Sequence, residues 1–319
     1  MNIIDNRYKI VKEFVNNNII NTYLVEDIEN NDNKLILKRL IISEISDWKI
    51  VELFERESEI LKYLDHVGIA KYIEAKHLTE DGEEIFYLVQ EYIEGKSLKE
   101  FIEKGIPLSE NDIFNITQEL LEILDYLSNL VPPIIHRDIK PSNIMIREDK
   151  SVVLIDFGAI NNVSSMNSKD ITVVGTAGFM APEQLMGHAT IQSDLYSVGT
   201  TLINLLTRIN PATLPIIDMK IQFRRDTGFN TFFKNFIDEL IHPQTKYRIK
   251  TPKKALKYLE KIRNGKFGRD VFAIAKDNAE KEVKRDESDK TNVRLFIIIS
   301  FIILFLAGFF SFLIKGGAS

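Results

Sequence analysis

The chain has 319 residues, of which 45% are hydrophobic, so it is long enough for a two-lobed fold with a sizeable core and an additional apolar segment. Its formal net charge of -5 argues against a general nucleic-acid-binding surface. The absence of cysteine excludes disulfides, thiolate zinc sites and a cysteine nucleophile, and the five histidines lack the spacing of metal ligands. Residues 1–5 lack a basic stretch followed by an apolar run, which predicts no signal peptide.

The N-terminal part of the chain is rich in strand-like segments. Residues 8–25 are predicted to form a hairpin that turns at Asn16-Asn17-Asn18. Residues 34–38 alternate as a strand does, and residues 72–75 and 85–89 are two further strand-like runs. Together these segments predict a small, mostly β region.

An amphipathic helix is predicted between these strands, from Trp48 to Leu64. Its apolar stripe consists of Ile50, Leu53, Phe54, Ile60, Leu61 and Leu64. Glu57 lies on the same stripe, and a carboxylate on an inward face is costly unless it is paired. Lys38 in the preceding strand is the candidate partner, whereas a Glu57 at the edge of the stripe could instead reach solvent.

A longer helix is predicted to begin after Ser109. Apolar residues recur at helical spacing from Ile113 to Leu127, and Pro132-Pro133 is expected to end the helix. This segment is interpreted as a core helix that leads into a polar loop.

That loop, residues 136–143, lies between two apolar runs. It presents a carboxylate, an ammonium and a carboxamide, from Asp138, Lys140 and Asn143. Beyond the strand-like run at residues 152–155, Asp156-Phe157-Gly158 is predicted to place a second carboxylate beside this loop. A merely solvated polar loop is the alternative, and the presence of both motifs in this order disfavours it.

Between residues 161 and 292 the chain alternates between polar, apolar and highly charged segments. Residues 161–174 are polar without a clear period, and the following stretch closes with Ala181-Pro182-Glu183. An apolar helix is predicted from Ser193 to Leu206, and Thr251-Pro252 opens another helix. From residue 264 to 292 charges of both signs dominate, which predicts an exposed and partly helical linker.

Every residue from Leu295 to Ile314 is apolar or small, and Arg294 and Lys315 flank this run. Its length matches one helix that crosses a bilayer, and a buried core helix is the weaker alternative. Lys and Arg are plentiful before the span, which places the preceding residues on the cytoplasmic side.

The two polar loops, Lys38 with Glu57, and the closing Ala181-Pro182-Glu183 together resemble the motifs of eukaryotic-type (Hanks-type) Ser/Thr protein kinases. The resemblance covers roughly residues 8–262 and is closest to bacterial members. It implies an α+β, two-lobed protein kinase fold, with a small mostly β N-lobe and a larger mostly α C-lobe, followed by one C-terminal transmembrane helix. The expected boundaries are 1–92 for the N-lobe, 93–263 for the C-lobe, 264–293 for a charged juxtamembrane linker, 294–315 for the transmembrane helix and 316–319 for a short extracytoplasmic tail.

The resemblance also implies roles for individual residues. Asp138 is expected to act as the base that accepts the hydroxyl proton, with Lys140 near the transferring phosphate. Asn143 and Asp156 are expected to hold Mg²⁺ or Mn²⁺. Lys38 would hold the α and β phosphates of ATP, and its pairing with Glu57 would mark the active arrangement.

Nucleotide binding is where the chain departs most from the family pattern. Adenine is expected to contact the backbone of Glu91 and Ile93, in a hinge that follows Gln90. The three glycines of the phosphate-covering loop are replaced by Val15, Asn17 and Ile20. Side chains at these positions hinder close backbone approach to phosphates, which puts the ATP affinity in doubt.

Regulatory and structural roles follow from the same resemblance. A buried Arg137 would need an anion, and phosphate on Thr172 of the activation segment could supply it, although neighbouring hydroxyls compete for that role. Thr176 is expected to contact Asp138 and Lys140, as in kinases with Ser/Thr substrates. Two structural contacts are also expected, with Asp194 anchoring the backbone of the 136–143 loop and Arg248 pairing with Glu183.

The sequence is therefore interpreted as a membrane-anchored Ser/Thr protein kinase with a cytoplasmic kinase domain. It would transfer the γ-phosphate of ATP to protein hydroxyls and phosphorylate its own activation loop, and dimerisation in trans is a family-level expectation. A pseudokinase scaffold is the main alternative, because of the missing glycines. A small-molecule kinase is a third reading, which the full activation segment from Asp156 to Glu183 disfavours.

Overall fold

The computed structural model describes residues 3–16, 19–45, 48–80, 82–157, 178–223 and 229–265. The chain divides into two units, residues 1–264 and 265–319, and the elements described below belong to the first. The predicted transmembrane helix at 294–315, the tail at 316–319 and the linker from residue 266 onward lie outside the described residues. Within the described ranges, no helix has the length and apolar character needed to span a bilayer.

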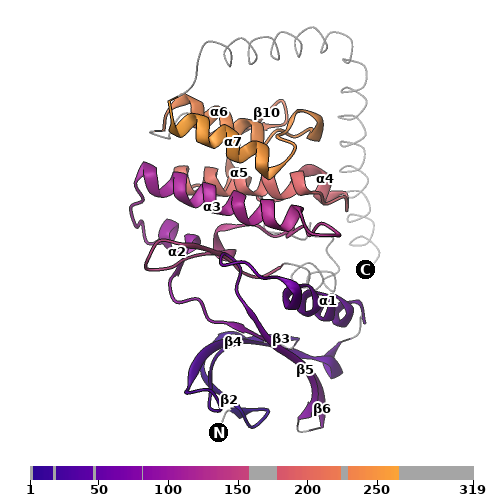
Figure 1. Cartoon of the computed structure of the whole chain (residues 1–319). Coiled ribbons are helices and arrows are strands. Elements are labelled where there is room, and N and C mark those ends of the chain that lie inside the picture. Colours follow the sequence, from indigo (N-terminus) through magenta and orange to yellow (C-terminus); the bar gives the residue numbers. More distant parts are fainter. Residues whose placement is uncertain are drawn as a thin grey trace, which may run out of the picture. The chain divides into compact units, whose positions relative to one another are not determined.

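An antiparallel sheet with the strand order β1-β2-β3-β4-β6-β5 forms the N-lobe and curls strongly (Figure 1). Its strands are β1 (Ile3–Ile4), β2 (Tyr8–Val15), β3 (Ile20–Asp27), β4 (Asn33–Ile41), β5 (Tyr72–Glu80) and β6 (Glu83–Glu91). The predicted hairpin is confirmed as β2 and β3, although Asn17 and Asn18 of its turn lie outside the described residues. Side chains close the curl, because Arg7 forms ion pairs with Asp27 at 2.7 Å and with Glu74 at 3.1 Å.

The helix predicted between these strands is α1 (Lys49–Tyr63). Its buried residues include Ile50, Phe54 and Leu61 of the predicted stripe. The ring of Phe54 packs edge-on against Phe86 of β6, with 5.0 Å between the ring centroids. Removing this apolar face from water holds α1 on the sheet, and Glu57 is carried inward with it.

Helices make up most of the C-lobe. They are α2 (Leu98–Glu103), α3 (Glu110–Ser128), α4 (Pro182–Leu185), α5 (Ile191–Thr207), α6 (Thr231–Leu240) and α7 (Pro252–Arg263). Short 3-10 turns occur at Ile42–Glu44, Pro141–Asn143, Pro211–Thr213 and Thr245–Tyr247. Ser109 caps α3 as predicted, through a capping box with Asp112.

Helix α3 ends a few residues before the proline pair that is expected to end it. Its last residue is Ser128, one after Leu127, and Pro132 follows beyond the C-cap residue Asn129. The side chains of Ser128 and Asn129 both donate hydrogen bonds to the carbonyl of Asp125, at 2.9 and 2.7 Å. Such local side-chain bonds compete with continued helix, which accounts for the earlier end.

A small antiparallel sheet in the C-lobe brings the two polar loops together. It consists of β7 (Lys96–Ser97), β8 (Ile144–Ile146) and β9 (Val152–Leu154), in that order. Because β8 follows the 136–143 loop and β9 precedes Asp156, pairing of these strands sets the loops side by side. The backbone N–H of Leu154 also donates to the carbonyl of Gly68, at 2.8 Å, which ties the two lobes together.

Between α5 and α6 the described residues contain one short 3-10 turn and a small hairpin. The hairpin consists of β10 (Ile216–Ile217) and β11 (Lys220–Ile221). Its turn residues Asp218 and Met219 have positive φ values of 50° and 62°, the geometry of a tight hairpin turn.

Candidate active site

The 136–143 loop is held from below by Asp194 in α5. One carboxylate oxygen accepts the backbone N–H of His136 at 2.8 Å, and the other accepts that of Arg137 at 2.9 Å. These are the anchoring contacts predicted for Asp194. Burial raises the pKa of Asp194 to about 7, against the effect of the two N–H donors. Arg137 has φ of 69°, so the anchor fixes a backbone conformation that non-glycine residues rarely adopt.

Two other side chains of this loop contact Asp138, which is buried. Lys140 Nζ lies 2.6 Å from Asp138 Oδ2. The amide of Asn143 donates to the backbone carbonyl of Asp138 at 2.9 Å and to its carboxylate at 3.0 Å. Burial raises the pKa of Asp138, while Lys140 and Asn143 act in the opposite direction. A carboxylate in this setting is well oriented and more basic than an exposed one.

His136 braces the loop from inside. It is fully buried, its Nδ1 accepts the backbone N–H of Asp138 at 3.3 Å, and its ring lies 4.6 Å from the ring of Phe157. Burial lowers the pKa of His136 from 6.5 to about 4, although Asp156 acts in the opposite direction. The histidine is therefore neutral at physiological pH and serves as a hydrogen-bond acceptor.

The ion pair predicted between Lys38 and Glu57 is present, and it includes a third member. Lys38 Nζ lies 3.0 Å from Glu57 Oε1 and 2.7 Å from Asp156 Oδ1. Glu57 is 1% exposed, so the alternative in which it reaches solvent is excluded. The contact joins β4, α1 and the segment after β9 in one polar cluster.

The charges of this cluster are strongly coupled. Burial opposes the charged form of Lys38, but Asp156 and Glu57 outweigh it and raise the pKa of the ammonium. Burial also raises the pKa of Glu57, and Lys38 only partly offsets this. For Asp156 the cations win over burial, because Lys38 and Lys140 both hold its pKa below the usual value. Asp156 is thus the carboxylate of this cluster that stays ionised most readily.

Asn143 and Asp156 have the donor chemistry of a magnesium site. The backbone N–H of Ile155 donates to the carbonyl of Asn143 at 2.9 Å, which holds the two segments together. Because the amide nitrogen of Asn143 faces Asp138, its oxygen is turned away from that carboxylate. One carboxylate and one amide oxygen suit Mg²⁺, which usually takes few protein ligands and completes its shell with phosphates and water. No cluster of three or more His, Cys, Asp or Glu that could hold a metal occurs in the described ranges.

Most of the residues expected to contact the nucleotide lie within the described ranges. Ile93 follows β6, and its backbone groups have no hydrogen-bond partner among the described residues, so they are free to meet an adenine edge. Glu91 ends β6, and its carboxylate pairs with Arg147 at 3.1 Å. Val15 ends β2 with a side chain that is 46% exposed, and Ile20 begins β3. Asn17 lies outside the described residues.

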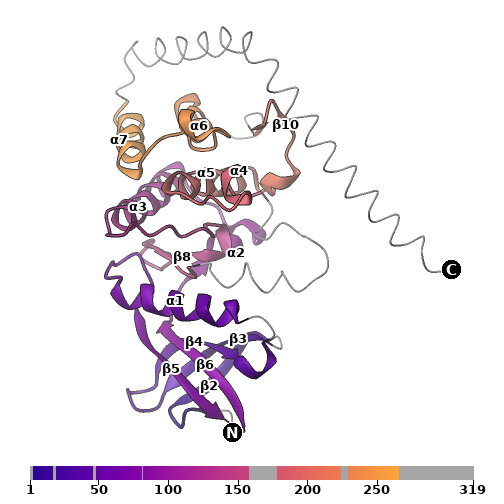
Figure 2. The same ribbon diagram turned by 90° about the vertical axis from the view of Figure 1, so that its right-hand side faces the viewer.

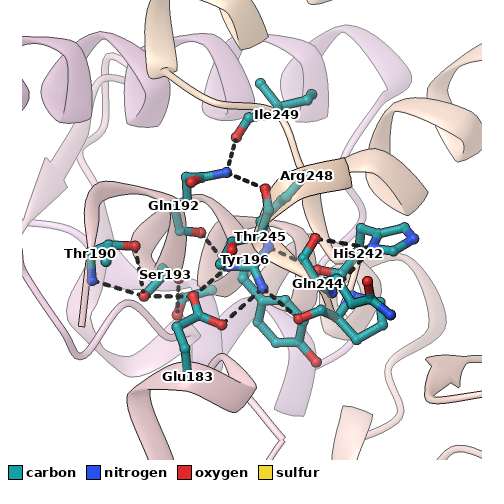
Figure 3. Close-up of polar contacts among 12 residues, drawn as sticks. Glu183, Thr190, Gln192, Ser193, Tyr196, His242, Gln244, Thr245, Arg248 and Ile249 are labelled. Carbon is teal, nitrogen blue, oxygen red and sulfur yellow. Dashed lines mark hydrogen bonds and ion pairs between the residues drawn. The ribbon is translucent and has the colours of Figure 1, made fainter. Parts of the chain in front are cut away.

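The predicted pair of Glu183 and Arg248 is also present (Figure 3). Two parallel bonds join them, Nη1 to Oε1 at 2.6 Å and Nη2 to Oε2 at 3.0 Å. Burial acts against the ionised carboxylate, but Arg248 outweighs it and lowers the pKa of Glu183. This pair fastens the C-terminal end of the activation segment, Glu183, to the C-lobe core.

Sequence reasoning missed the polar residues that surround this pair. Ser193 donates to Glu183 Oε1 at 2.7 Å, and Arg248 Nη1 donates to the carbonyl of Gln192 at 2.8 Å (Figure 3). The side chain of Gln184 donates to the carbonyl of Arg137, which links α4 to the 136–143 loop. Nothing in the local sequence marks such a contact, because its two partners lie far apart in the chain.

One premise about regulation was wrong. Arg137 is exposed, not buried, because Asp194 and Gln184 hold its backbone and leave its side chain at the surface. Thr172, Thr176 and Gly158 lie outside the described residues.

Comparison with known proteins adds to this geometry. The protein kinase domain family matches residues 21–259. The chain is similar to serine/threonine-protein kinase D of Synechocystis sp., at 38% identity over 217 residues, which cover 64% of this chain and 41% of the relative. It is also similar to serine/threonine-protein kinase PrkC of Bacillus subtilis, at 34% identity over 208 residues that cover 64% and 31%. The chain thus spans less than half the length of these relatives.

A solved structure described as the PpkA-294 apo form shares the fold, with a TM-score of 0.65 and 20% identity over 81% of this chain and 97% of that one. The family match runs from β3 through both polar loops into α7. This chain therefore belongs to the protein kinase family, among the Hanks-type Ser/Thr kinases.

Proposed function

We propose that this chain is a membrane-anchored Ser/Thr protein kinase that transfers the γ-phosphate of ATP to Ser and Thr hydroxyls of proteins. One observation carries the proposal. Lys38 is held by Glu57, the ion pair that phosphoryl transfer by protein kinases requires, and Lys38 also contacts Asp156, the proposed metal ligand of the other lobe. The loop that carries Asp138, Lys140 and Asn143 lies beside this cluster through the pairing of β8 and β9.

In the proposed reaction, Asp138 accepts the proton of the incoming hydroxyl. Its buried position raises its basicity, and Asn143 fixes its orientation through two hydrogen bonds. Lys140 sits against the same carboxylate and is placed to neutralise charge on the transferring phosphate. Because the transition state is loose and anionic, positioning and charge neutralisation supply most of the catalysis.

Mg²⁺ and ATP fit the remaining groups. Asn143 and Asp156 would hold Mg²⁺, which would neutralise charge on the phosphates when bound. Lys38 would hold the α and β phosphates, since Glu57 and Asp156 keep it charged and extended into the site. The backbone of Glu91 and Ile93 would bind adenine.

The loss of the loop glycines does not remove any charged group from this site. Val15 and Ile20 would hinder backbone contact with phosphates and so weaken ATP binding. A scaffold without activity would not need the charged side chains of Lys38, Glu57, Asp138 and Asp156 to be held together by ion pairs. Their arrangement therefore favours an active enzyme over a pseudokinase.

Anchoring and regulation complete the proposal. The apolar residues 295–314 support a single span with the kinase domain on the cytoplasmic side. Thr172 is the proposed site of autophosphorylation, and the exposed Arg137 is available to bind its phosphate. Resistance of the full chain to alkaline carbonate extraction from membranes would support anchoring, and its release would exclude a spanning helix.

The direct test of the activity is phosphate transfer by the full chain with Mg²⁺ and labelled ATP, followed by phosphoamino-acid analysis. We expect label on Ser and Thr of the chain itself and of a general acceptor protein, and none in Asp138→Asn. Label on a sugar or aminoglycoside but on no protein would instead identify a small-molecule kinase. Folded chain that transfers no phosphate, even when held as a dimer, would identify a pseudokinase.

A further inference from the structure

The outer face of α7 carries only lysines over about 100° of the helix circumference, at 100° per residue. These residues are Lys253, Lys254, Lys257 and Lys261, and all four are exposed. The opposite face is buried through Ala255, Leu259 and Ile262. We call the four lysines the α7 basic face.

The charge of this face is not neutralised by its neighbours. None of its four ammonium groups has an ion-pair partner in the described ranges, and Glu260 is the sole acidic residue of α7. Some exposed lysines elsewhere are paired, as Lys9 is with Glu26 and Lys150 with Asp112, and what distinguishes α7 is that four unpaired lysines share one helix face. In a chain whose net charge is -5, this concentration of cations is a local reversal of sign.

The helix that carries this face is attached to α3 by hydrogen bonds. Arg263, at the end of α7, donates hydrogen bonds to Gln118 at 2.9 Å and to Asn111 at 3.2 Å, both in α3. Both views place α6 and α7 at the end of the C-lobe that is farthest from the strands of the N-lobe (Figures 1 and 2). The face is therefore rigid and lies well away from Asp138, so a ligand there leaves the active site open.

We propose that the α7 basic face binds an anionic phospholipid surface. Lysines on one helix face can lay their stems along the interface and direct their ammonium groups to lipid phosphates. Each lysine near an anionic leaflet adds attraction, which a flat surface delivers to all four at once. The proposal rests on the proposed membrane anchor, which would keep the kinase domain within reach of the cytoplasmic leaflet.

The test uses the full chain in lipid nanodiscs. Because the chain has no cysteine, Glu260→Cys gives a single labelling site beside the basic face. Energy transfer from a dye at this site to a labelled lipid headgroup is compared between phosphatidylcholine discs and discs that contain phosphatidylglycerol. We expect at least about twofold more transfer with the anionic lipid at about 0.1 M salt, and no difference at about 1 M, where screening is nearly complete.

Matched variants separate the face from general charge. The variant Lys253→Gln, Lys254→Gln, Lys257→Gln, Lys261→Gln should lose the lipid dependence. A control that loses four other exposed lysines, Lys34, Lys62, Lys71 and Lys99, should keep it. Equal transfer in both lipids, or equal loss in both variants, would overturn the proposal. So would a response to added RNA with no response to anionic lipid.

Failure of the anchor is distinguished in the same preparation. If carbonate releases the chain from membranes, the anchor is wrong, and the dye signal is then measured with free chain and added vesicles. A signal that depends on phosphatidylglycerol and on the four lysines still upholds the basic face. If the free chain gives no such signal with the vesicles, both the membrane anchor and lipid binding by the α7 basic face are rejected. Kinase activity measured in the same samples tests the proposed phosphate transfer separately.

Discussion

The two halves of the proposed nucleotide site are built in different ways. The half around Asp138 is made of side chains that fix one another, from Lys38 and Glu57 to Asn143 and Asp156. The half around β2 and β3 relies on backbone approach to phosphates, and its glycine positions carry Val15 and Ile20. A side-chain cluster loses its function when one member is lost. A loop that binds phosphates through its backbone loses affinity gradually as its glycines are replaced. This comparison indicates that chemistry resides in the first half and affinity in the second.

The largest effect should come from breaking the chemistry. Asp138→Asn removes the base and keeps its shape, so we expect the transfer rate to fall by about 10³-fold with little change in ATP binding. Single-turnover transfer and nucleotide binding measure the two effects separately. Asp149→Asn, on the exposed turn between β8 and β9, is the matched control and should keep full activity. A rate within a few fold of wild type in Asp138→Asn would remove Asp138 from the mechanism.

The next largest effect should come from breaking the ion pair of Glu183 and Arg248, which supports the catalytic half. Arg248→Met leaves Glu183 partly buried without its bidentate partner, so we expect the free energy of unfolding to fall by about 4 kcal/mol. Lys246→Met, which changes an exposed neighbour, should cost little. Chemical denaturation measures both. Equal stability of the two variants would show that the pair does not support the fold.

His136 gives the catalytic half a pH dependence. Its folded pKa of about 4 lies below the usual 6.5, so its contribution to stability is present above 6.5 and is lost as pH falls toward 4. The expected loss is about 3 kcal/mol. In His136→Leu this loss should vanish. The free energy of unfolding of the wild type minus that of the variant should therefore fall as the pH is lowered from 7 to 4. A difference that stays constant with pH would contradict the buried, neutral histidine.

Glu57→Gln tests the link between the two halves. Lys38 would keep Asp156 as its ionic partner but lose the one on α1, so we expect catalytic efficiency to fall by about 100-fold. Glu59→Gln, exposed on the same helix, is the control. Steady-state kinetics measure the effect, and equal efficiencies would show that α1 does not position the lysine.

The sequence predicted the two-lobed kinase fold and most of the side-chain half because short motifs carry those residues at fixed spacings. The pair of Lys38 with Glu57 followed from the cost of burying a charge and from family resemblance, and the pair of Glu183 with Arg248 from the resemblance alone. It did not predict the second ion pair of Lys38, to Asp156, nor the contact of Gln184 with Arg137, because each joins segments distant in sequence. The burial expected for Arg137 was wrong for a similar reason, since a loop's side-chain exposure depends on what holds its backbone.

One measurement tests the central contrast most directly. Steady-state kinetics of the full chain are compared with those of Val15→Gly, Asn17→Gly, Ile20→Gly, which restores the family's glycines. If chemistry resides in the side-chain cluster, KM for ATP should fall by about tenfold while kcat stays within about twofold. An inactive wild type that gains kcat on restoring the glycines would contradict the account, because the loop would then control the chemical step itself.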